Sequence, residues 1–160
     1  MKVCVYAICK NESQFVDRFM DSMSEADYVC VLDTGSSDDT VKKLRARGAI
    51  LGETVVSPWR FDTARNESLG LIPADADICC AIDLDEQFHP GWRAALERAW
   101  QPDTTRARYR YTWSFRPDGS EGMVFWADKI HKNGCYRWAS PVHETLVYTG
   151  EGAERFVGAA

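Results

Sequence analysis

The sequence predicts an α/β fold in which a mostly parallel sheet is flanked by helices. Two observations lead to this prediction. The first hundred residues contain near-continuous apolar runs of strand length, and helix-length segments with an apolar stripe alternate with them. Uninterrupted apolar strands are typical of parallel sheets, whose strands are buried on both faces. The length of 160 residues corresponds to one domain.

Each predicted strand of the first hundred residues is a short apolar run that ends in polar residues. These strands are Val3–Ile8, Tyr28–Leu32, a segment within Ala49–Val56, and Ile78–Ile82. The helices between them are recognised by capping residues and apolar stripes. They begin at Ser13 and at the capping-box pair Ser36 and Asp39, span Asp62–Leu71, and open after Pro90-Gly91.

After about residue 103 the pattern changes to short strands and turns. Arg106–Phe115 alternates arginine and aromatic residues with a period of two, which favours a strand with one wet basic face. Further short strands are predicted at Met123–Ile130 and Tyr136–Trp138, and the segment His143–Tyr148 follows Pro141. We expect an antiparallel or mixed segment here, followed by a Gly/Ala-rich tail from Gly150 that frays.

Composition excludes several classes of protein. Lys plus Arg is 19 and Asp plus Glu is 24, so the net charge is −5, which disfavours nonspecific nucleic-acid binding. The chain has no apolar run of roughly 18–20 residues that could cross a membrane. The N-terminal MKVCVYAICKNE lacks a signal-peptide cleavage site, so we expect a cytoplasmic protein.

The cysteine pattern lacks a CxxC pair. The six cysteines are Cys4, Cys9, Cys30, Cys79, Cys80 and Cys135, and most of them lie in apolar runs. We interpret them as reduced thiols that serve as small core residues. Zinc binding or a disulfide framework is the alternative.

The sequence also predicts whether several tryptophans and histidines are buried or exposed. Trp113, Trp126 and Trp138 could stack on a ligand, but we expect at least two of them to be buried in the core. His89 and His131 have no metal-site context, and we expect them to face solvent, with a place lining a substrate as the alternative for His131.

Polar clusters follow three of the predicted strands, where ligands bind in parallel sheets. The most informative is Asp83-Leu84-Asp85, because two carboxylates two residues apart on an extended strand project from the same face. Such oxygen ligands suit Mg²⁺ or Mn²⁺, which can neutralise a diphosphate. The alternative is a polar strand end with helix-capping acids.

Four motifs in order together resemble the family 2 glycosyltransferases of the GT-A fold. They are Lys10-Asn11-Glu12, Asp33-Thr34-Gly35-Ser36-Ser37-Asp38, Ala64-Arg65-Asn66 and Asp83-Leu84-Asp85. The segment Val142-His143-Glu144 is similar to one that closes the catalytic core in one branch of that family. The resemblance implies a GT-A, Rossmann-like sheet and a donor that is a UDP-sugar.

The resemblance also implies a role for each matched residue. Asp33 would accept a hydrogen bond from the uracil imide, while Ala7 and Glu12 would line the uridine. Arg65 would approach the phosphates, and Asp83 would contact the ribose or sugar. The metal ligands would be Asp85 and His143, and a histidine ligand favours Mn²⁺ over Mg²⁺.

Inverting transfer needs a general base, for which the candidates are Glu144 and Asp128. Glu144 could instead orient His143, and Asp128 could be a surface or ion-pair residue.

Taken together, residues 1–160 are expected to form one GT-A domain. Residues 1–100 would form the donor half, residues 101–150 the metal and acceptor half, and residues 151–160 the tail. The expected activity is metal-dependent, inverting transfer of a hexose from a UDP-sugar. The acceptor would be a glycan, peptide, lipid or other small molecule, and a partner domain or second subunit could supply contacts to it. The alternatives are a nucleotide-sugar-binding domain with little or no activity, and a nucleotidyltransferase on a related fold.

Overall fold

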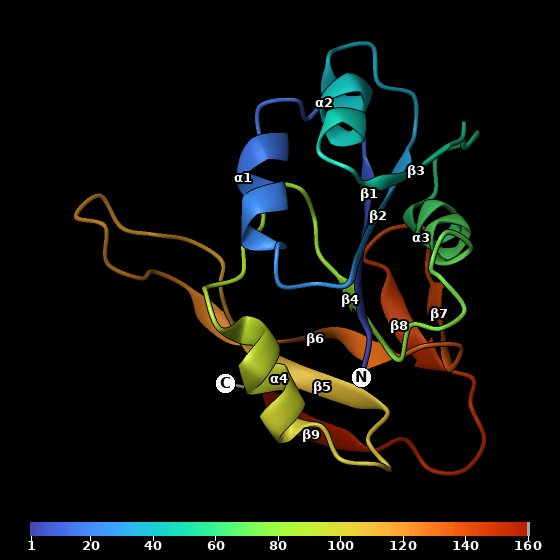
Figure 1. The fold of residues 1–160 in the computed structure, drawn as a ribbon, viewed down its shortest axis with the longest axis vertical. Helices are drawn as coiled ribbons and strands as arrows, with labels where there is room; N and C mark the ends of the chain where they lie inside the picture. The colour runs from blue at the N-terminus through green and yellow to red at the C-terminus, as the bar shows by residue number, and fades with distance from the viewer. Residues whose placement is uncertain (160) are drawn as a thin grey trace.

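A seven-stranded sheet forms the centre of the protein, shown in Figure 1 as a computed structural model that describes residues 1–159. Its strands are β1 (Val3–Cys9), β2 (Tyr28–Asp33), β3 (Ile50–Glu53), β4 (Ile78–Ala81), β5 (Arg106–Thr112), β6 (Val124–Lys132) and β9 (Phe156–Ala159). Their order is β3-β2-β1-β4-β6-β5-β9. The first four are mutually parallel, β4–β6 and β6–β5 are antiparallel, and β5–β9 is parallel.

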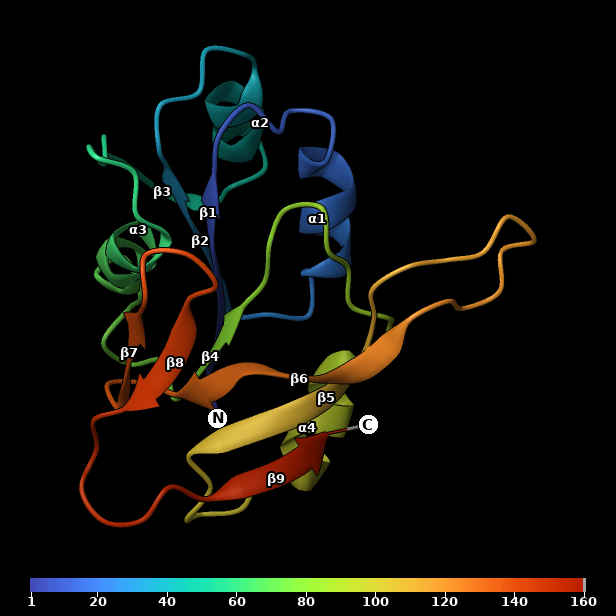
Figure 2. The same cartoon turned by 180° about the vertical axis from the view of Figure 1, so that it is seen from behind.

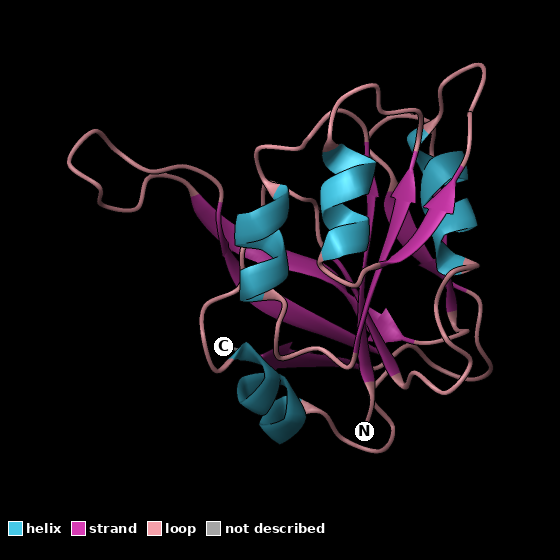
Figure 3. Cartoon of the chain, turned by 45° about the horizontal axis from the view of Figure 1, so that its top comes forward, coloured by secondary structure: helices cyan, strands magenta, loops and turns pink. Residues whose placement is uncertain are grey.

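Four helices accompany the sheet: α1 (Val16–Ser22), α2 (Thr40–Ala46), α3 (Phe61–Leu69) and α4 (Trp92–Ala99) (Figure 3). A separate two-stranded antiparallel sheet joins β7 (Tyr136–Ala139) to β8 (Thr145–Tyr148). The predicted α/β class and the mixed C-terminal segment are therefore confirmed.

Alternate residues of β1 place its two faces in different cores, and all seven of its residues are buried. Val3 and Val5 belong to a core with residues of α1, α2 and α4. Cys4 and Tyr6 belong to a second core with Trp138 of β7 and residues of β8. Both faces of the sheet are therefore covered, as the apolar strands predicted.

Two predicted helix caps are wrong. The residue that precedes α1 is Phe15, and no side chain caps that helix, so Ser13 does not have this role. The Ser36 hydroxyl donates to Asp33 instead of capping α2, and Asp38 Oδ1 accepts from the backbone N–H of Thr40 at 3.0 Å. The loop after β2 uses these polar side chains to hold its own shape.

The C-terminal segment is a strand, so the predicted frayed tail is wrong. β9 pairs with β5 in parallel, from Arg106 opposite Phe156 to Tyr109 opposite Ala159. The guanidinium of Arg108 lies 4.6 Å from the centre of the Phe156 ring. A cation–π contact and ladder hydrogen bonds therefore both attach β9 to β5.

The cysteines are free thiols, and five of the six are buried. Within residues 1–159 no group of three or more His, Cys, Asp or Glu side chains is placed to hold a metal ion. The interpretation as core residues is confirmed for these five, whereas Cys135 is half-buried.

The expectations for tryptophan and for one histidine are wrong. Trp138 is 2% exposed, but Trp113 is 64% exposed and Trp126 is 59% exposed. Both exposed tryptophans belong to the β5–β6 hairpin or its extension, which projects away from the sheet (Figure 2). His131 is buried, since β6 pairs with β4 in the centre of the sheet, whereas His89 is exposed as expected.

None of the helices in the described part of the chain has the length and apolar character needed to cross a membrane.

Candidate functional site

A cavity of about 320 Å³ opens at the carboxyl ends of β1, β2 and β4. It is lined by Ile8, Cys9, Lys10, Glu12, Thr34, Trp59, Phe61, Arg65, Asp83 and Asp85. A larger hollow, of about 660 Å³, lies near Met1 and Asn133 at the other end of the strands and contains none of the motif residues. The polar motifs and the topology of a parallel sheet both point to the smaller cavity as the site.

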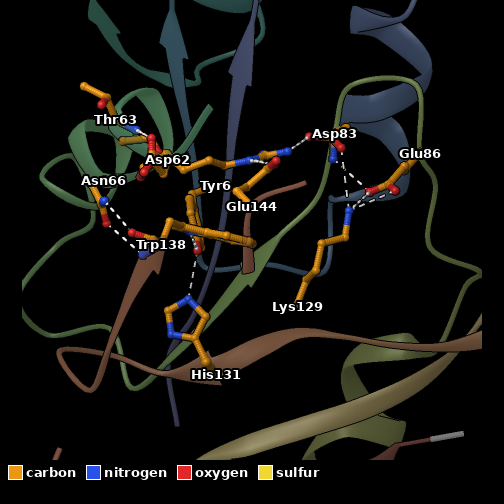
Figure 4. Close-up of polar contacts among 12 residues, drawn as sticks. Tyr6, Asp62, Thr63, Asn66, Asp83, Glu86, Lys129, His131, Trp138 and Glu144 are labelled. Carbon is orange, nitrogen blue, oxygen red and sulfur yellow. Dashed lines mark hydrogen bonds and ion pairs between the residues drawn. The ribbon is translucent and has the colours of Figure 1, made fainter. Parts of the chain in front are cut away.

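Arg65 is the central side chain of this cavity. It lies on α3 and is only 4% exposed. Its Nη2 donates to Asp83 Oδ1 at 2.6 Å, and its Nε donates to Glu144 Oε1 at 3.1 Å, so the guanidinium bridges two carboxylates (Figure 4). The third nitrogen, Nη1, is buried and has no hydrogen-bond partner among residues 1–159. A buried unsatisfied donor is costly, and an anion in the cavity would satisfy it.

The charges around Arg65 favour the ionised forms of Arg65 and Asp83. Burial alone would lower the pKa of Arg65, but the carboxylates of Asp83 and Glu144 outweigh burial, and its pKa lies above the usual value. Burial would also raise the pKa of Asp83, but Arg65 and Lys129 outweigh it and hold that pKa below the usual value.

Two partners of Asp83 were missed by the sequence analysis. Lys129 Nζ lies 3.6 Å from Asp83 Oδ2 and 3.0 Å from Glu86 Oε1. Glu86 Oε2 accepts from the Asp83 backbone N–H at 2.9 Å (Figure 4). Lys129 reaches the site because β6 runs antiparallel to β4, with Ile130 opposite Cys80. The only feature of the sequence that pointed to Lys129 was the presence of a lysine in a predicted strand.

The two carboxylates of the Asp83-Leu84-Asp85 motif do not share the face of a strand, so that prediction is wrong. β4 ends at Ala81, and the Glu86 N–H donates to the Asp83 carbonyl at 3.0 Å, which closes a turn. Asp83 is held by Arg65 and Lys129, whereas Asp85 is exposed. Both residues still line the cavity.

Glu12 adds a third carboxylate to the cavity lining. Burial, together with the negative charges of Asp85 and Asp83, raises its pKa to about 7. The cavity therefore places a concentration of negative charge beside the cationic Arg65.

Hydrogen bonds between α3 and the C-terminal segment bring Glu144 to Arg65. The side chain of Asn66 donates to the Trp138 carbonyl and accepts from the Trp138 N–H, both at 2.8 Å (Figure 4). The Phe61 N–H donates to the Pro141 carbonyl at 3.0 Å. These bonds fix β7 and the loop that follows it against α3, so Glu144 can reach the guanidinium.

Asp33 is buried at the end of β2, where its carboxylate supports the following loop. Oδ2 accepts from the N–H groups of Gly35 and Ser36 at 3.0 and 2.9 Å, and Oδ1 accepts from Ser36 Oγ. The neighbouring Thr34 lines the cavity, and Asp33 does not.

The remaining predicted residues lie outside the cavity wall. Ala7 is wholly buried within β1, and the cavity is lined by the next two residues of that strand. His143 is exposed and has a positive φ of 56°. Asp128 is bound by Arg106, whose Nη2 lies 3.1 Å from Asp128 Oδ1.

The structure thus gathers only some of the predicted residues. Those at the cavity or bound to its wall are Glu12, Arg65, Asp83, Asp85 and Glu144, while Ala7, Asp33, His143 and Asp128 do not line it. The wall residues that sequence reasoning missed include Trp59 and Phe61, whose rings are 5.2 Å apart. These two aromatic residues lie shortly before the Ala64-Arg65-Asn66 motif, and this position is the feature of the sequence that could have assigned them to the site.

No family model matches the chain. The fold is similar to a glucosyl-3-phosphoglycerate synthase from Mycobacterium tuberculosis in complex with uridine diphosphate, with 25% identity, a TM-score of 0.57 and coverage of 72% of this chain and 44% of that one. The same enzyme in complex with Mn²⁺, uridine diphosphate and glucosyl-3-phosphoglycerate gives 24% identity, a TM-score of 0.56 and the same coverage.

A mannosyl-3-phosphoglycerate synthase from Rubrobacter xylanophilus is similar at 17% identity and a TM-score of 0.57, over 70% of this chain and 40% of that one. This chain therefore spans less than half the length of these enzymes. The parallel sheet, its covering helices and the small antiparallel sheet are those of a GT-A glycosyltransferase fold.

Proposed function

We propose that this domain transfers a sugar from a UDP-sugar to an acceptor hydroxyl with the help of a divalent cation. The observation that carries the proposal is Arg65, a buried arginine that lines a cavity at the carboxyl ends of parallel strands and whose Nη1 has no partner among residues 1–159. Its planar donors suit the oxygen atoms of a diphosphate. The similar structures that contain uridine diphosphate support this assignment.

The cavity offers carboxylate oxygens to a hard divalent cation, although no three His, Cys, Asp or Glu side chains converge among residues 1–159. Asp85 is exposed at the cavity and Glu12 lies in its wall, while Asp83 is engaged by Arg65 and Lys129. Such oxygens suit Mn²⁺ or Mg²⁺, with open positions left for phosphate. When bound, the cation supplies neutralisation of the diphosphate leaving group. We retain Asp85 and His143 as the proposed ligands, and the similar structures that contain Mn²⁺ or Mg²⁺ support a metal.

The uridine is proposed to lie along the strand ends at Ile8, Cys9 and Thr34. A bond from the uracil imide to Asp33 would replace the Ser36 hydroxyl as the partner of Oδ1. Ala7 would then act through the backbone of β1, and Glu12 would close the pocket beside the ribose.

The reaction proposed is a single displacement with inversion, of the family 2 type. The acceptor oxygen forms a bond to the anomeric carbon while the bond from that carbon to the diphosphate oxygen breaks, and the electron pair leaves on the diphosphate. The acceptor proton goes to Glu144 Oε2, since Oε1 accepts the bond from Arg65. Asp128 is the weaker candidate because Arg106 engages its carboxylate.

A binding domain without turnover is the second candidate, and a specific contact favours it. The bond from Arg65 Nε to Glu144 is the kind expected of a structural ion pair as well as of a positioned base. Such a domain would bind UDP-sugars and release no UDP from them.

Calorimetry of UDP binding with Mn²⁺ and with EDTA tests the proposal. The wild-type protein should bind UDP strongly only with Mn²⁺, and Asp85→Asn should lose this dependence. Asp39→Asn, at an exposed acid outside the cavity, is the matched control. Equal affinity in EDTA and Mn²⁺ would exclude the metal role. A thermal-shift screen of UDP-sugars then ranks the donors, because a ligand of the folded state raises stability.

A further inference from the structure

A second hollow, of about 450 Å³, adjoins the donor cavity and shares Asp85 with it. It is lined by Ile82 and Phe88 and, along an outer wall, by the β5 residues from Tyr109 onward and by Trp113 and Phe115 beyond the end of β5. We call it the hairpin groove. Its lining runs from Asp85, the metal-ligand candidate, to Trp113 and Phe115 beyond the end of β5.

The outer wall is aromatic and exposed. Trp113 is 64% exposed and Phe115 is 66% exposed, and both line the groove. The rings of Tyr111 and Trp113 lie 6.3 Å apart, and Phe125 lies 5.2 Å from Tyr111. Large exposed aromatic side chains beside a groove mark a binding surface, and Trp and Tyr rings combine an apolar face with a polar edge.

The charges of the groove are largely neutralised by internal pairs. Arg110 forms two bonds of 2.5 Å to Glu121, and Glu86 is held by Lys129. Arg18 remains as a cation whose bond is to a backbone carbonyl, that of Asp85, at 2.8 Å. A phosphate- or carboxylate-bearing acceptor needs a cluster of free arginines or lysines, and this groove does not offer one.

A polar group in the wall is unsatisfied. The hydroxyl of Tyr109 is buried and has no hydrogen-bond partner among residues 1–159. Because this hydroxyl has almost no exposed surface, the exposed aromatic side chains of the wall carry the assignment of the occupant.

We propose that the hairpin groove binds the acceptor, and that the acceptor is an uncharged saccharide stacked on Trp113 and Phe115. This inference rests on the proposed function, since it places the acceptor hydroxyl next to Asp85 and the donor sugar. It differs from the neighbouring enzymes named as 3-phosphoglycerate synthases, whose acceptor is anionic.

Saturation-transfer NMR in the presence of UDP and Mn²⁺ tests the groove without requiring turnover. The neutral probes are maltotriose, cellotriose, mannotriose, galactotriose and chitotriose, and the anionic probe is 3-phosphoglycerate. At least one neutral probe should bind, and Trp113→Ala should weaken it by roughly tenfold, which corresponds to about 1.4 kcal/mol. Trp126→Ala is the matched control, because this tryptophan is 59% exposed on the same hairpin but does not line the groove.

UDP affinity, measured by calorimetry, should be unchanged in both variants. If the wild-type protein does not bind UDP, the proposed function is wrong. If it binds UDP but gives no saccharide signal that depends on Trp113, only the groove assignment is overturned. Preferential binding of 3-phosphoglycerate would also overturn it. The assignment would be wrong as well if Trp113→Ala abolished a dimer in size-exclusion chromatography, or if both tryptophan variants equally reduced binding to phosphatidylcholine vesicles.

Discussion

Arg65 and Glu144 are 79 residues apart in the chain, and Arg65 Nε donates to Glu144 Oε1 at 3.1 Å. The same guanidinium binds Asp83 Oδ1 at 2.6 Å through Nη2. One side chain from α3 therefore connects the turn after β4 with the loop before β8. In the proposed function, this connection holds the leaving-group side and the base side of the reaction in one arrangement.

Arg65→Lys should weaken UDP binding by roughly 10–100-fold, because one ammonium cannot bind both carboxylates and also donate to a diphosphate. The matched control is Arg60→Lys, since Arg60 pairs with Asp62 near the start of the same helix and does not line the cavity. Calorimetry gives the affinities, and circular dichroism shows whether each variant is folded. Wild-type affinity in a folded Arg65→Lys protein would remove Arg65 from the donor site.

Glu144→Gln should leave UDP affinity within about twofold and reduce transfer by roughly 100-fold or more. Glutamine keeps an oxygen for the bond from Arg65 but cannot accept the acceptor proton. The measurement is UDP release from a UDP-sugar in the presence of the acceptor. Asp128→Asn provides the comparison, and a larger loss in that variant would move the base to Asp128. A loss of Mn²⁺ affinity in Glu144→Gln, with transfer retained, would instead support a role in orienting His143.

Stability should fall as the pH falls from 6.5 toward 4, because His131 is buried in its neutral form. Its Nδ1 lies 3.0 Å from the Lys132 carbonyl and its Nε2 lies 2.9 Å from the Tyr6 hydroxyl, so Nδ1 is assigned the proton and Tyr6 donates to Nε2. Burial lowers the pKa of His131 to about 4. Between pH 4 and the ordinary value of about 6.5, the unfolded chain binds this proton and the folded chain does not, so stability rises with pH in that window.

Because the pKa of His131 is lower in the folded protein than in the unfolded chain, lowering the pH from 7 to 5 should reduce the free energy of unfolding by about 2 kcal/mol. Urea denaturation at both pH values of the wild type and His131→Gln measures it, since the variant lacks this contribution. If the variant does not fold, an NMR titration of the wild-type imidazole gives the pKa directly. A His131 pKa near 6.5 would contradict the prediction.

Phe156→Ala should lower the melting temperature by about 2–4 °C without changing UDP affinity. The Phe156 ring packs against the guanidinium groups of Arg108 and Arg106, at 4.6 and 5.6 Å, and so attaches β9 to β5. Val55→Ala is the control for loss of an exposed apolar side chain, because Val55 is 81% exposed. An unchanged melting temperature would mean that β9 contributes little to stability.

The sequence alone determined the class of fold and the end of the sheet where the site lies. Apolar runs such as Val3–Ile8 and Ile78–Ile82 predict buried strands. Such a run consists of neighbouring residues, so it is a local property of the chain. Parallel strands then bring the residues that follow them to one edge of the sheet. Together with the family resemblance of the four motifs, this order along the chain assigned Glu12, Arg65, Asp83 and Asp85 to a common site, and all four line the cavity.

The tertiary structure decided which partners each of these side chains has. Lys129 reaches Asp83 because β6 is antiparallel to β4, and Glu144 reaches Arg65 because Asn66 holds β7. The tertiary structure also decided that His131 is buried and that Trp113 is exposed. These outcomes depend on strand order and on contacts between residues far apart in the chain, whereas hydrophobic periodicity reports only whether a short segment has an apolar face.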